Sequence, residues 1–166
     1  MKNDTLRGEV TFEFARLEGV DFSHMDLSGF NFRQAGLAGA DLSCTNLTGA
    51  NLAKADLTGA DLARADLTGA NLAEADLTGA NLAKADLTGA ELRGADLTKA
   101  NLMQATITAT DCTQAIFTEA WLEYVDLVTA DLTGASFTGA YMEGVKFQKA
   151  DEEKGRRGMI HNHEGT

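Results

Sequence analysis

The chain of 166 residues carries 14 Lys and Arg against 25 Asp and Glu, giving a net charge of −11 at pH 7 and an isoelectric point near 4.6. This balance argues against direct nucleic-acid binding and against an anionic membrane surface, because both require clustered cations. A hydrophobic content of 44% is typical of one globular domain, and no apolar run approaches the ~20 residues that cross a bilayer. The first ten residues lack the apolar core of a signal peptide, so we expect a cytoplasmic protein.

Residues 1–9 form a short polar lead-in or cap, after which a five-residue period runs from residue 10 to residue 150. Residues 51–70, for example, read NLAKA DLTGA DLARA DLTGA. Every fifth residue from Phe12 to Phe147, which we name the centre, is apolar: 28 positions, 19 of them Leu. The residue before each centre is mostly Asp or Asn, and the residue before that is usually Ala. This internal periodicity predicts a solenoid.

A period of five fits neither regular secondary structure. Residues five apart are rotated by ~140° on an α-helix, and an odd spacing puts successive residues on opposite faces of a strand. The chain must therefore turn once in each repeat, with the centre residue pointing inward. We expect the core to contain centres such as Leu57, Leu62, Leu67, Leu72, Leu77 and Leu82.

The corners between the sides alternate in sequence. The second residue after the centre is Gly at every tenth position from Gly19 to Gly89, and a larger residue, from Phe14 to Lys84, lies between these glycines. A ten-residue alternation needs an even number of sides per coil, and four sides make the smallest plausible closed shape. We expect two alternating corner geometries, with the glycines taking the positive φ of a type II turn.

The A(D/N)LxX pattern resembles the pentapeptide-repeat family, and the resemblance covers residues 10–150. It implies an all-β fold, a right-handed quadrilateral β-helix with four pentapeptides per coil, so the 28 centres make about seven coils. Members of this family often begin with a capping helix, for which residues 1–9 are too few. We expect aromatic side chains to plug that end instead: Phe12, Phe14, Phe22, Phe30 and Phe32.

Most other residues of the repeat have a structural explanation. Asp and Asn before the centre are expected to bind nearby backbone groups, and stacked residues such as Thr58 and Thr78 are expected to form a ladder of hydroxyls. Cys44 and Cys112 lie more than three coils apart in a four-sided rod, too far for a disulfide. Cys112 stands at a centre and is predicted to be an inert core thiol.

The predicted faces divide the surface charge. The two opposite faces with glycine corners carry no basic residue between Arg16 and Lys99. They carry Asp26 and five further aspartates, which we take as a candidate interaction surface: Asp56, Asp66, Asp76, Asp86 and Asp96. One interpretation is that this charge keeps a repetitive β surface soluble. The family resemblance implies another, because its quinolone-resistance branch imitates the phosphate charge of duplex DNA and binds DNA gyrase or topoisomerase.

The repeat degenerates between Met103 and Val128. Trp121 and Tyr141 stand before a centre, on one predicted face in adjacent coils, and Tyr124 lies at the corner beside them. We interpret these aromatics as a patch that binds a protein partner; the alternative is that they only cover the last coils. The final coil also offers a surface for an end-to-end homodimer, formed by Met142, Val145 and Phe147.

No arrangement of residues predicts catalysis. Of the three histidines, His24 lies at a corner, and His161 and His163 lie in segment 151–166, which is polar and expected to be disordered. We expect no catalytic residue, no metal and no cofactor. The predicted function is a non-catalytic solenoid that binds or scaffolds an unidentified protein partner. The alternatives are a DNA mimic directed at gyrase and a regulator of one protein through the aromatic residues.

Overall fold

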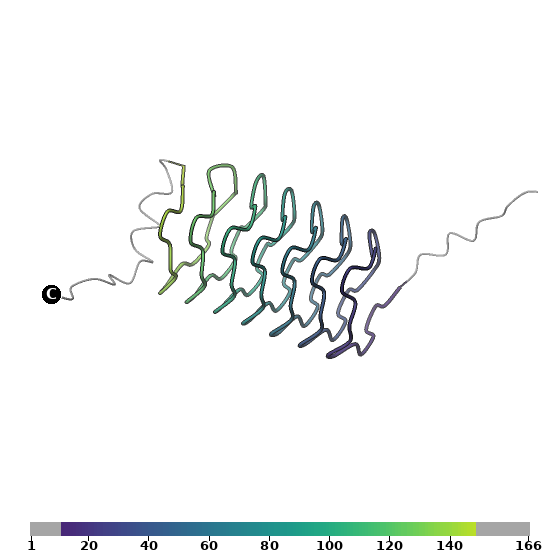
Figure 1. Ribbon diagram of the computed structural model, residues 1–166. Helices are drawn as coiled ribbons and strands as arrows, with labels where there is room; N and C mark the ends of the chain where they lie inside the picture. Colours follow the sequence, from purple (N-terminus) through teal and green to yellow (C-terminus); the bar gives the residue numbers. More distant parts are fainter. Residues whose placement is uncertain (1–10, 149–166) are drawn as a thin grey trace, which may run out of the picture.

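The structure, a computed structural model, describes residues 11–148. Its coils stack along one axis into a rod, and the chain advances steadily from one end to the other (Figure 1). The predicted lead-in at residues 1–9 and the predicted tail at residues 151–166 lie outside the described residues. Within residues 11–148 there is no helix of the length and apolar character that crossing a membrane requires.

Each coil is twenty residues long. The backbone pairs in parallel at single residues, each bridged to the residue twenty positions later, from Thr11 with Asn31 to Asp126 with Lys146. Over the described range each strand is therefore one bridged residue between turns, and no helix occurs. The bridges form four columns of seven residues each, so the rod has seven coils. One of the columns consists of Thr11, Asn31, Asn51, Asn71, Glu91, Asp111 and Asp131. The four-sided geometry predicted from the period is confirmed.

Centre residues fill the interior of the rod. Each fully buried Leu contributes ~1.5–3 kcal/mol to stability by leaving water. In the middle coils, from Ala35 to Ala130, the residue two positions before each centre is buried as well, because the side chains of four centres converge within one coil. All six centres expected in the core are completely buried: Leu57, Leu62, Leu67, Leu72, Leu77 and Leu82.

In a regular repeat of the middle coils, four of the five backbone N–H groups donate to carbonyl oxygens. The centre N–H and the N–H two residues later bond to the next coil, and the N–H before the centre bonds to the preceding coil. The third N–H after the centre closes the turn on the centre carbonyl. Proline would remove one of these donors, and the chain contains none. Around Leu57 the bonds are 2.7–3.0 Å long: Leu57 to Asp76, Gly59 to Thr78, Asp61 to Ala40 and Ala60 to Leu57.

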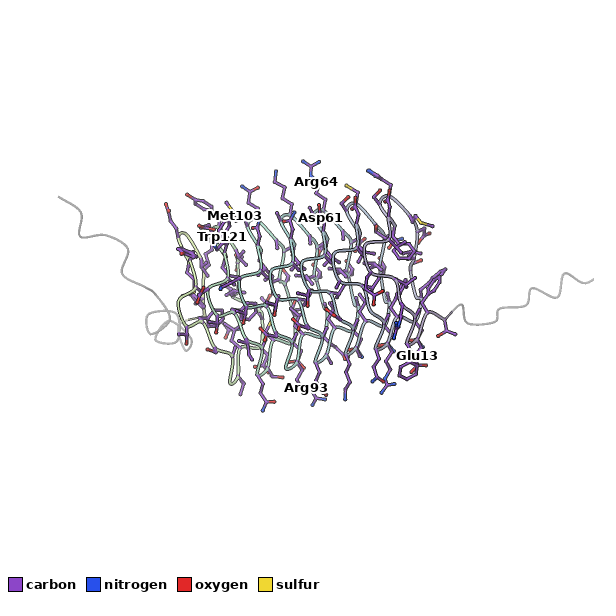
Figure 2. All side chains as sticks on the ribbon, turned by 90° about the horizontal axis from the view of Figure 1, so that it is seen from below. Glu13, Asp61, Arg64, Arg93, Met103 and Trp121 are labelled. Carbon is purple, nitrogen blue, oxygen red and sulfur yellow. The ribbon has the colours of Figure 1, made fainter. Side chains whose placement is uncertain are left out.

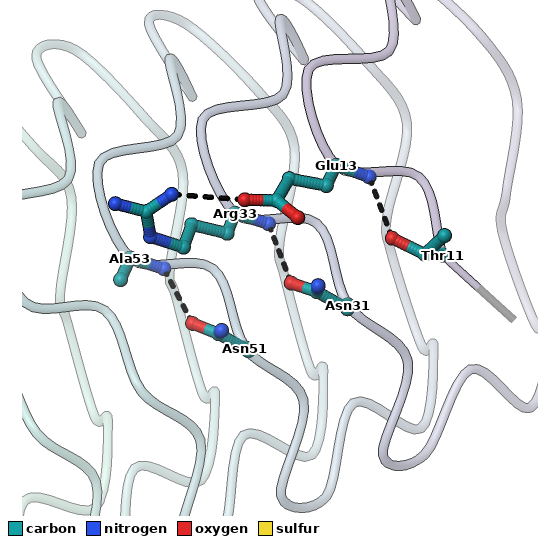
Figure 3. Close-up of polar contacts among 6 residues, drawn as sticks. All are labelled: Thr11, Glu13, Asn31, Arg33, Asn51 and Ala53. Carbon is teal, nitrogen blue, oxygen red and sulfur yellow. Dashed lines mark hydrogen bonds and ion pairs between the residues drawn. The ribbon is translucent and has the colours of Figure 1, made fainter. Parts of the chain in front are cut away.

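The fifth N–H, on the residue after the centre, donates to the Asp or Asn side chain two residues before it. The N–H of Ala53, for example, donates to Oδ1 of Asn51 at 3.2 Å. Figure 3 shows the equivalent bond in three stacked coils, where an ion pair of 2.8 Å between Arg33 and Glu13 also joins neighbouring coils. The backbone role expected for these Asp and Asn side chains is confirmed.

Both kinds of corner share one backbone conformation, so the prediction of two alternating geometries is wrong. Lys54 and Arg64 have φ values of 60° and 59°, close to the 63° of Gly59. A turn closed on the centre carbonyl, with a positive φ only at its third residue, is of type II. A side chain in this region costs roughly 1–2 kcal/mol, and hydrogen bonds to the neighbouring coils offset that strain.

Aromatic rings fill the amino-terminal end of the described rod. Phe12 stacks on Phe32 at a centroid distance of 5.1 Å, and Phe22 and Phe30 pack beside them. Phe14, predicted to join this plug, is instead 63% exposed, and that prediction is wrong. The reason is its place at a corner, where a residue with positive φ directs its side chain away from the core.

The corner at residues 127–130 departs from the others. Thr129 lacks the positive φ found at the equivalent position of the other described corners. Its hydroxyl accepts the N–H of Ala109 at 3.0 Å, in place of the carbonyl that accepts this bond elsewhere. Figure 1 shows a widened turn in this part of the rod, close to its carboxy-terminal end.

Candidate binding surface

Three aromatic side chains, Trp121, Tyr124 and Tyr141, form a surface that we name the aromatic patch. Trp121 and Tyr141 are bridged residues of adjacent coils, and their rings meet edge to face at 6.2 Å with an interplanar angle of 89°. They are 48% and 41% exposed, and Tyr124 is 61% exposed. In Figure 2, Trp121 lies on the same side of the rod as Met103 and far from Glu13 at the other end.

Tyr124 packs against the glycine one coil further along. A Cβ atom added at Gly144 would lie 2.7 Å from Cδ1 of Tyr124, so the tyrosine ring occupies the space that a side chain would need. The Tyr124 hydroxyl donates to Oε1 of Glu143 at 3.3 Å. The last coil therefore supports the ring on one side, while much of the ring faces solvent.

Trp121 and Tyr141 cannot make the side-chain-to-backbone hydrogen bond that Asp or Asn makes at this position in earlier coils. In earlier coils of this column the residue before the centre is Asp or Asn, as at Asp41, Asp61 and Asn81, and its side chain accepts the N–H two residues later. An indole only donates, and a tyrosine hydroxyl lies too far from its own backbone to accept this bond. At Trp121 and Tyr141 exposed aromatic surface therefore stands where earlier coils have this side-chain-to-backbone bond.

Two glutamates that the repeat pattern does not single out, Glu123 and Glu143, stand beside the aromatic patch. Each follows the centre in one of the two coils that carry Trp121 and Tyr141. Oε2 of Glu123 is enclosed and has no hydrogen-bond partner within the described part of the chain. The sequence does carry one signal for them: residues 100–145 contain no Lys, Arg or His, so an acidic residue there has no basic residue within the same stretch to pair with.

The five predicted aspartates lie in two bridged columns on opposite faces of the rod. Asp56, Asp76 and Asp96 are consecutive partners in one column, and Asp66 pairs with Asp86 in the other. None of the five belongs to an ion pair among residues 11–148. The ion pairs found there join other stacked residues: Arg33–Glu13, Lys54–Glu74, Lys99–Glu119 and Lys146–Asp126.

Hydroxyl groups after the centre bind the aspartates of their own coil. The Thr58 hydroxyl donates to Oδ1 of Asp56 at 2.6 Å, a bond within one coil where a ladder between coils was expected. At the equivalent place, the hydroxyl of Thr68, and then its N–H, hold the pKa of Asp66 below its usual value of 3.8. Both bonds act in this direction because they stabilise the charged carboxylate.

The chemistry of the remaining polar groups is limited. Within residues 11–148, no group of three His, Cys, Asp or Glu side chains is arranged to hold a metal ion. Both thiols are free, with Cys44 exposed and Cys112 buried, and burial raises the pKa of Cys112 to about 12. The predicted burial of Cys112 is confirmed. His161 and His163 lie outside the described residues.

The final described coil closes partly on itself. Met142 is buried, Val145 and Phe147 are half-buried against the core, and Phe147 meets Phe137 edge to face at 6.0 Å. The end-to-end homodimer through this coil stays a prediction, to be tested by sedimentation equilibrium.

Sequence comparison agrees with the geometry. The pattern of pentapeptide repeats, in eight copies, matches five stretches of the chain: residues 15–52, 31–69, 45–82, 70–108 and 110–151. The chain belongs to the pentapeptide repeat family. Its architecture is therefore the right-handed quadrilateral β-helix of that family. A comparison with curated protein sequences found no match.

Solved structures of pentapeptide repeat proteins resemble the rod. HetL of the cyanobacterium Nostoc sp. strain PCC 7120, involved in heterocyst differentiation regulation, is 33% identical, with a TM-score of 0.65 over 92% of this chain and 75% of HetL. A protein of the Arabidopsis thaliana thylakoid lumen is 37% identical over 60% of this chain and 66% of its own, with a TM-score of 0.47. QnrB1, a plasmid-mediated fluoroquinolone resistance protein, is 17% identical over 91% and 96%, with a TM-score of 0.47.

Proposed function

We propose that this pentapeptide repeat protein is a non-catalytic rod that binds or scaffolds a protein partner through its aromatic patch. The observation that carries the proposal is the exposure of Trp121, Tyr124 and Tyr141 on adjacent coils, at positions where earlier coils have mostly polar residues. Trp and Tyr are the residues most enriched at the energetic centres of protein interfaces. The coils below would serve as a rigid support, because each is hydrogen-bonded to both neighbours.

Recovery of a partner from an extract of the source organism tests this proposal. Proteins that co-purify with the tagged chain are identified by mass spectrometry, and the binding is repeated with the purified partner. Trp121→Ala combined with Tyr141→Ala should weaken binding by at least about ten-fold, since the two substitutions remove both stacked anchors. Phe14→Ala is the matched control, because it removes an exposed aromatic ring at the other end of the rod. Unchanged recovery by the double variant would reject the patch.

The aspartate columns favour a second candidate function, the binding of DNA gyrase or another topoisomerase as a mimic of DNA. Stacked carboxylates such as Asp56, Asp76 and Asp96 recur once per coil, ~4.8 Å apart, in a line that no ion pair of the described residues neutralises. Supercoiling by purified gyrase, with and without a quinolone, tests this candidate. An effect at micromolar protein that Asp56→Asn with Asp76→Asn abolishes would support it, and no effect would remove it.

A further inference from the structure

The aromatic patch lies in an acidic stretch of the chain, and within residues 11–148 no ion pair includes the two carboxylates beside it. Residues 100–145 contain six acidic residues and no Lys, Arg or His. Two of the six are paired with a lysine just outside this stretch: Glu119 with Lys99 at 3.6 Å and Asp126 with Lys146 at 3.5 Å. Neither pair includes Glu123 or Glu143, the two carboxylates beside the patch.

Glu123 carries the clearest sign of a missing partner. Its side chain is half-buried, and its Oε2 atom is enclosed without a hydrogen bond among residues 11–148. A carboxylate oxygen removed from water costs free energy until a donor reaches it. If the half-buried Glu123 side chain turns toward solvent, its carboxylate can accept from a donor of another molecule and lose that cost, so the site favours a cationic occupant over an apolar or acidic one.

The aromatic rings select among cations. In an edge-to-face pair one ring keeps both of its faces free of the other ring, and Trp121 and Tyr141 are each close to half exposed. A guanidinium group stacks on such a face and also donates two parallel hydrogen bonds to a carboxylate. A lysine ammonium can satisfy the carboxylate but lacks the flat surface that stacks.

We propose that the aromatic patch, with Glu123 and Glu143, binds an arginine side chain of a partner protein. This inference rests on the proposed function and names the chemistry of the partner. The guanidinium lies against an aromatic ring of the patch and donates to the Glu123 carboxylate, whose side chain turns outward on binding because its Oε2 atom is enclosed in the free protein. Glu143, which already accepts the Tyr124 hydroxyl at 3.3 Å, adds negative charge beside the guanidinium.

Trp121 itself reports on this binding, because it is the single tryptophan of the chain. The probe is a synthetic peptide of alternating Arg and Gly, titrated into the full-length protein while tryptophan emission is recorded. We expect a saturable change in emission, and about ten-fold weaker binding of the same peptide with Lys in place of Arg. Glu123→Gln with Glu143→Gln should also weaken binding by about ten-fold while leaving the circular dichroism spectrum unchanged.

The matched control removes the same two charges from another face. Asp56→Asn with Asp76→Asn should leave the affinity for the arginine peptide unchanged. Equal loss in both double variants, or equal affinity for the Arg and Lys peptides, would show general charge attraction and overturn the proposal. The chain's own Arg156 and Arg157 are the other source of guanidinium. A shift in Trp121 emission on Arg156→Gln with Arg157→Gln, without peptide binding by either form, would assign the site to that segment and overturn a partner in trans.

The two proposals fail separately. Loss of the natural partner by Trp121→Ala with Tyr141→Ala, but full binding by Glu123→Gln with Glu143→Gln, would leave the proposed function standing and overturn the arginine assignment. Unchanged binding of the natural partner by all of these variants would reject the aromatic patch as its site, and with it the arginine assignment.

Discussion

Oδ1 of Asp76 accepts the backbone N–H of Thr78 at 2.9 Å. Of the five backbone N–H groups in a regular repeat, four donate to carbonyl oxygens, either between coils or within the turn. The Thr78 N–H is the fifth, and the Asp76 side chain accepts it. An aspartate at this position is therefore part of the fold, although its charge also faces solvent. The same relationship explains why Trp121 and Tyr141 are unusual, since neither side chain can accept the equivalent N–H.

Replacing this acceptor separates its structural role from its charge. Asp76→Ala should lower the free energy of unfolding by about 1 kcal/mol, because the Thr78 N–H loses its partner. Asp76→Asn keeps an acceptor and should stay within about 0.5 kcal/mol of the native protein. Urea unfolding followed by circular dichroism measures both. Equal losses in the two variants would contradict the account, because they would implicate the charge.

The shared corner geometry predicts an asymmetry between two alanine variants. Gly59→Ala should cost about 1 kcal/mol, since it introduces a side chain at a φ of 63° where no neighbouring atom obstructs it. Arg64→Ala should change stability by less than about 0.5 kcal/mol, because Arg64 already holds a side chain at a φ of 59°. Thermal unfolding of the two variants provides the comparison. A larger loss at Arg64 than at Gly59 would be inconsistent with a common turn.

The free energy of unfolding should decrease at low pH, because several aspartates have a lowered pKa in the folded protein. Hydrogen bonds from Ser23, Ser28 and Thr68 lower the pKa of Asp21, Asp26 and Asp66, respectively, below 3.8. A lowered folded-state pKa stabilises the native protein fully above the unfolded value, and that contribution is lost as the pH falls through the folded value. The urea midpoint should therefore stay level above about pH 5 and fall below pH 3.8, modestly because these groups are exposed.

A single substitution checks the cause of this dependence at Asp66. Thr68→Val removes the hydroxyl that contributes most and should raise the pKa of Asp66 toward 3.8. Titration of the carboxylate by NMR measures the change. The assignment fails if the pKa of Asp66 in the variant equals that of the native protein.

The two cysteines should react at very different rates. Cys44 is exposed at a corner, whereas Cys112 is buried and its pKa is raised to about 12. At pH 8 a thiol reagent should modify one thiol per native chain rapidly, and the second only after denaturation, because the thiolate is the reactive form. Mass spectrometry of the labelled peptides identifies the site. Rapid modification of Cys112 in the native protein would contradict its place in the core.

The sequence predicts the architecture well because the repeat carries its own geometry. A strict period of five requires a turn in every repeat, and the buried centres such as Leu57 and Leu77 then share one axis. The corners were harder to predict, since Lys54 and Arg64 adopt a backbone conformation that local preference assigns to glycine. Coil-to-coil hydrogen bonds override that preference, and a pattern of residue types does not display them.

The candidate surface was only partly visible in the sequence. Trp121 and Tyr141 could be found because they break the Asp and Asn pattern of their column. The aromatic character of Phe14 predicts a place in the plug, but its corner position, with a positive φ, directs the ring to solvent. Glu123 was missed because glutamate is common on surfaces, and only the structure shows that its Oε2 atom is enclosed without a partner in the described range.

Disulfide trapping tests the four-sided coil, on which every face and column described here depends. In a Cys44→Ser background, Asn51→Cys with Asn71→Cys pairs two bridged residues, whereas Asn51→Cys with Asp61→Cys pairs residues two sides apart in one coil. Bridged backbones lie ~4.8 Å apart, within the ~4.4–6.8 Å between Cα atoms that a disulfide spans. Mild oxidation should cross-link the twenty-residue pair and leave the ten-residue pair reduced. Cross-linking of the ten-residue pair, or none in the twenty-residue pair, would contradict the account.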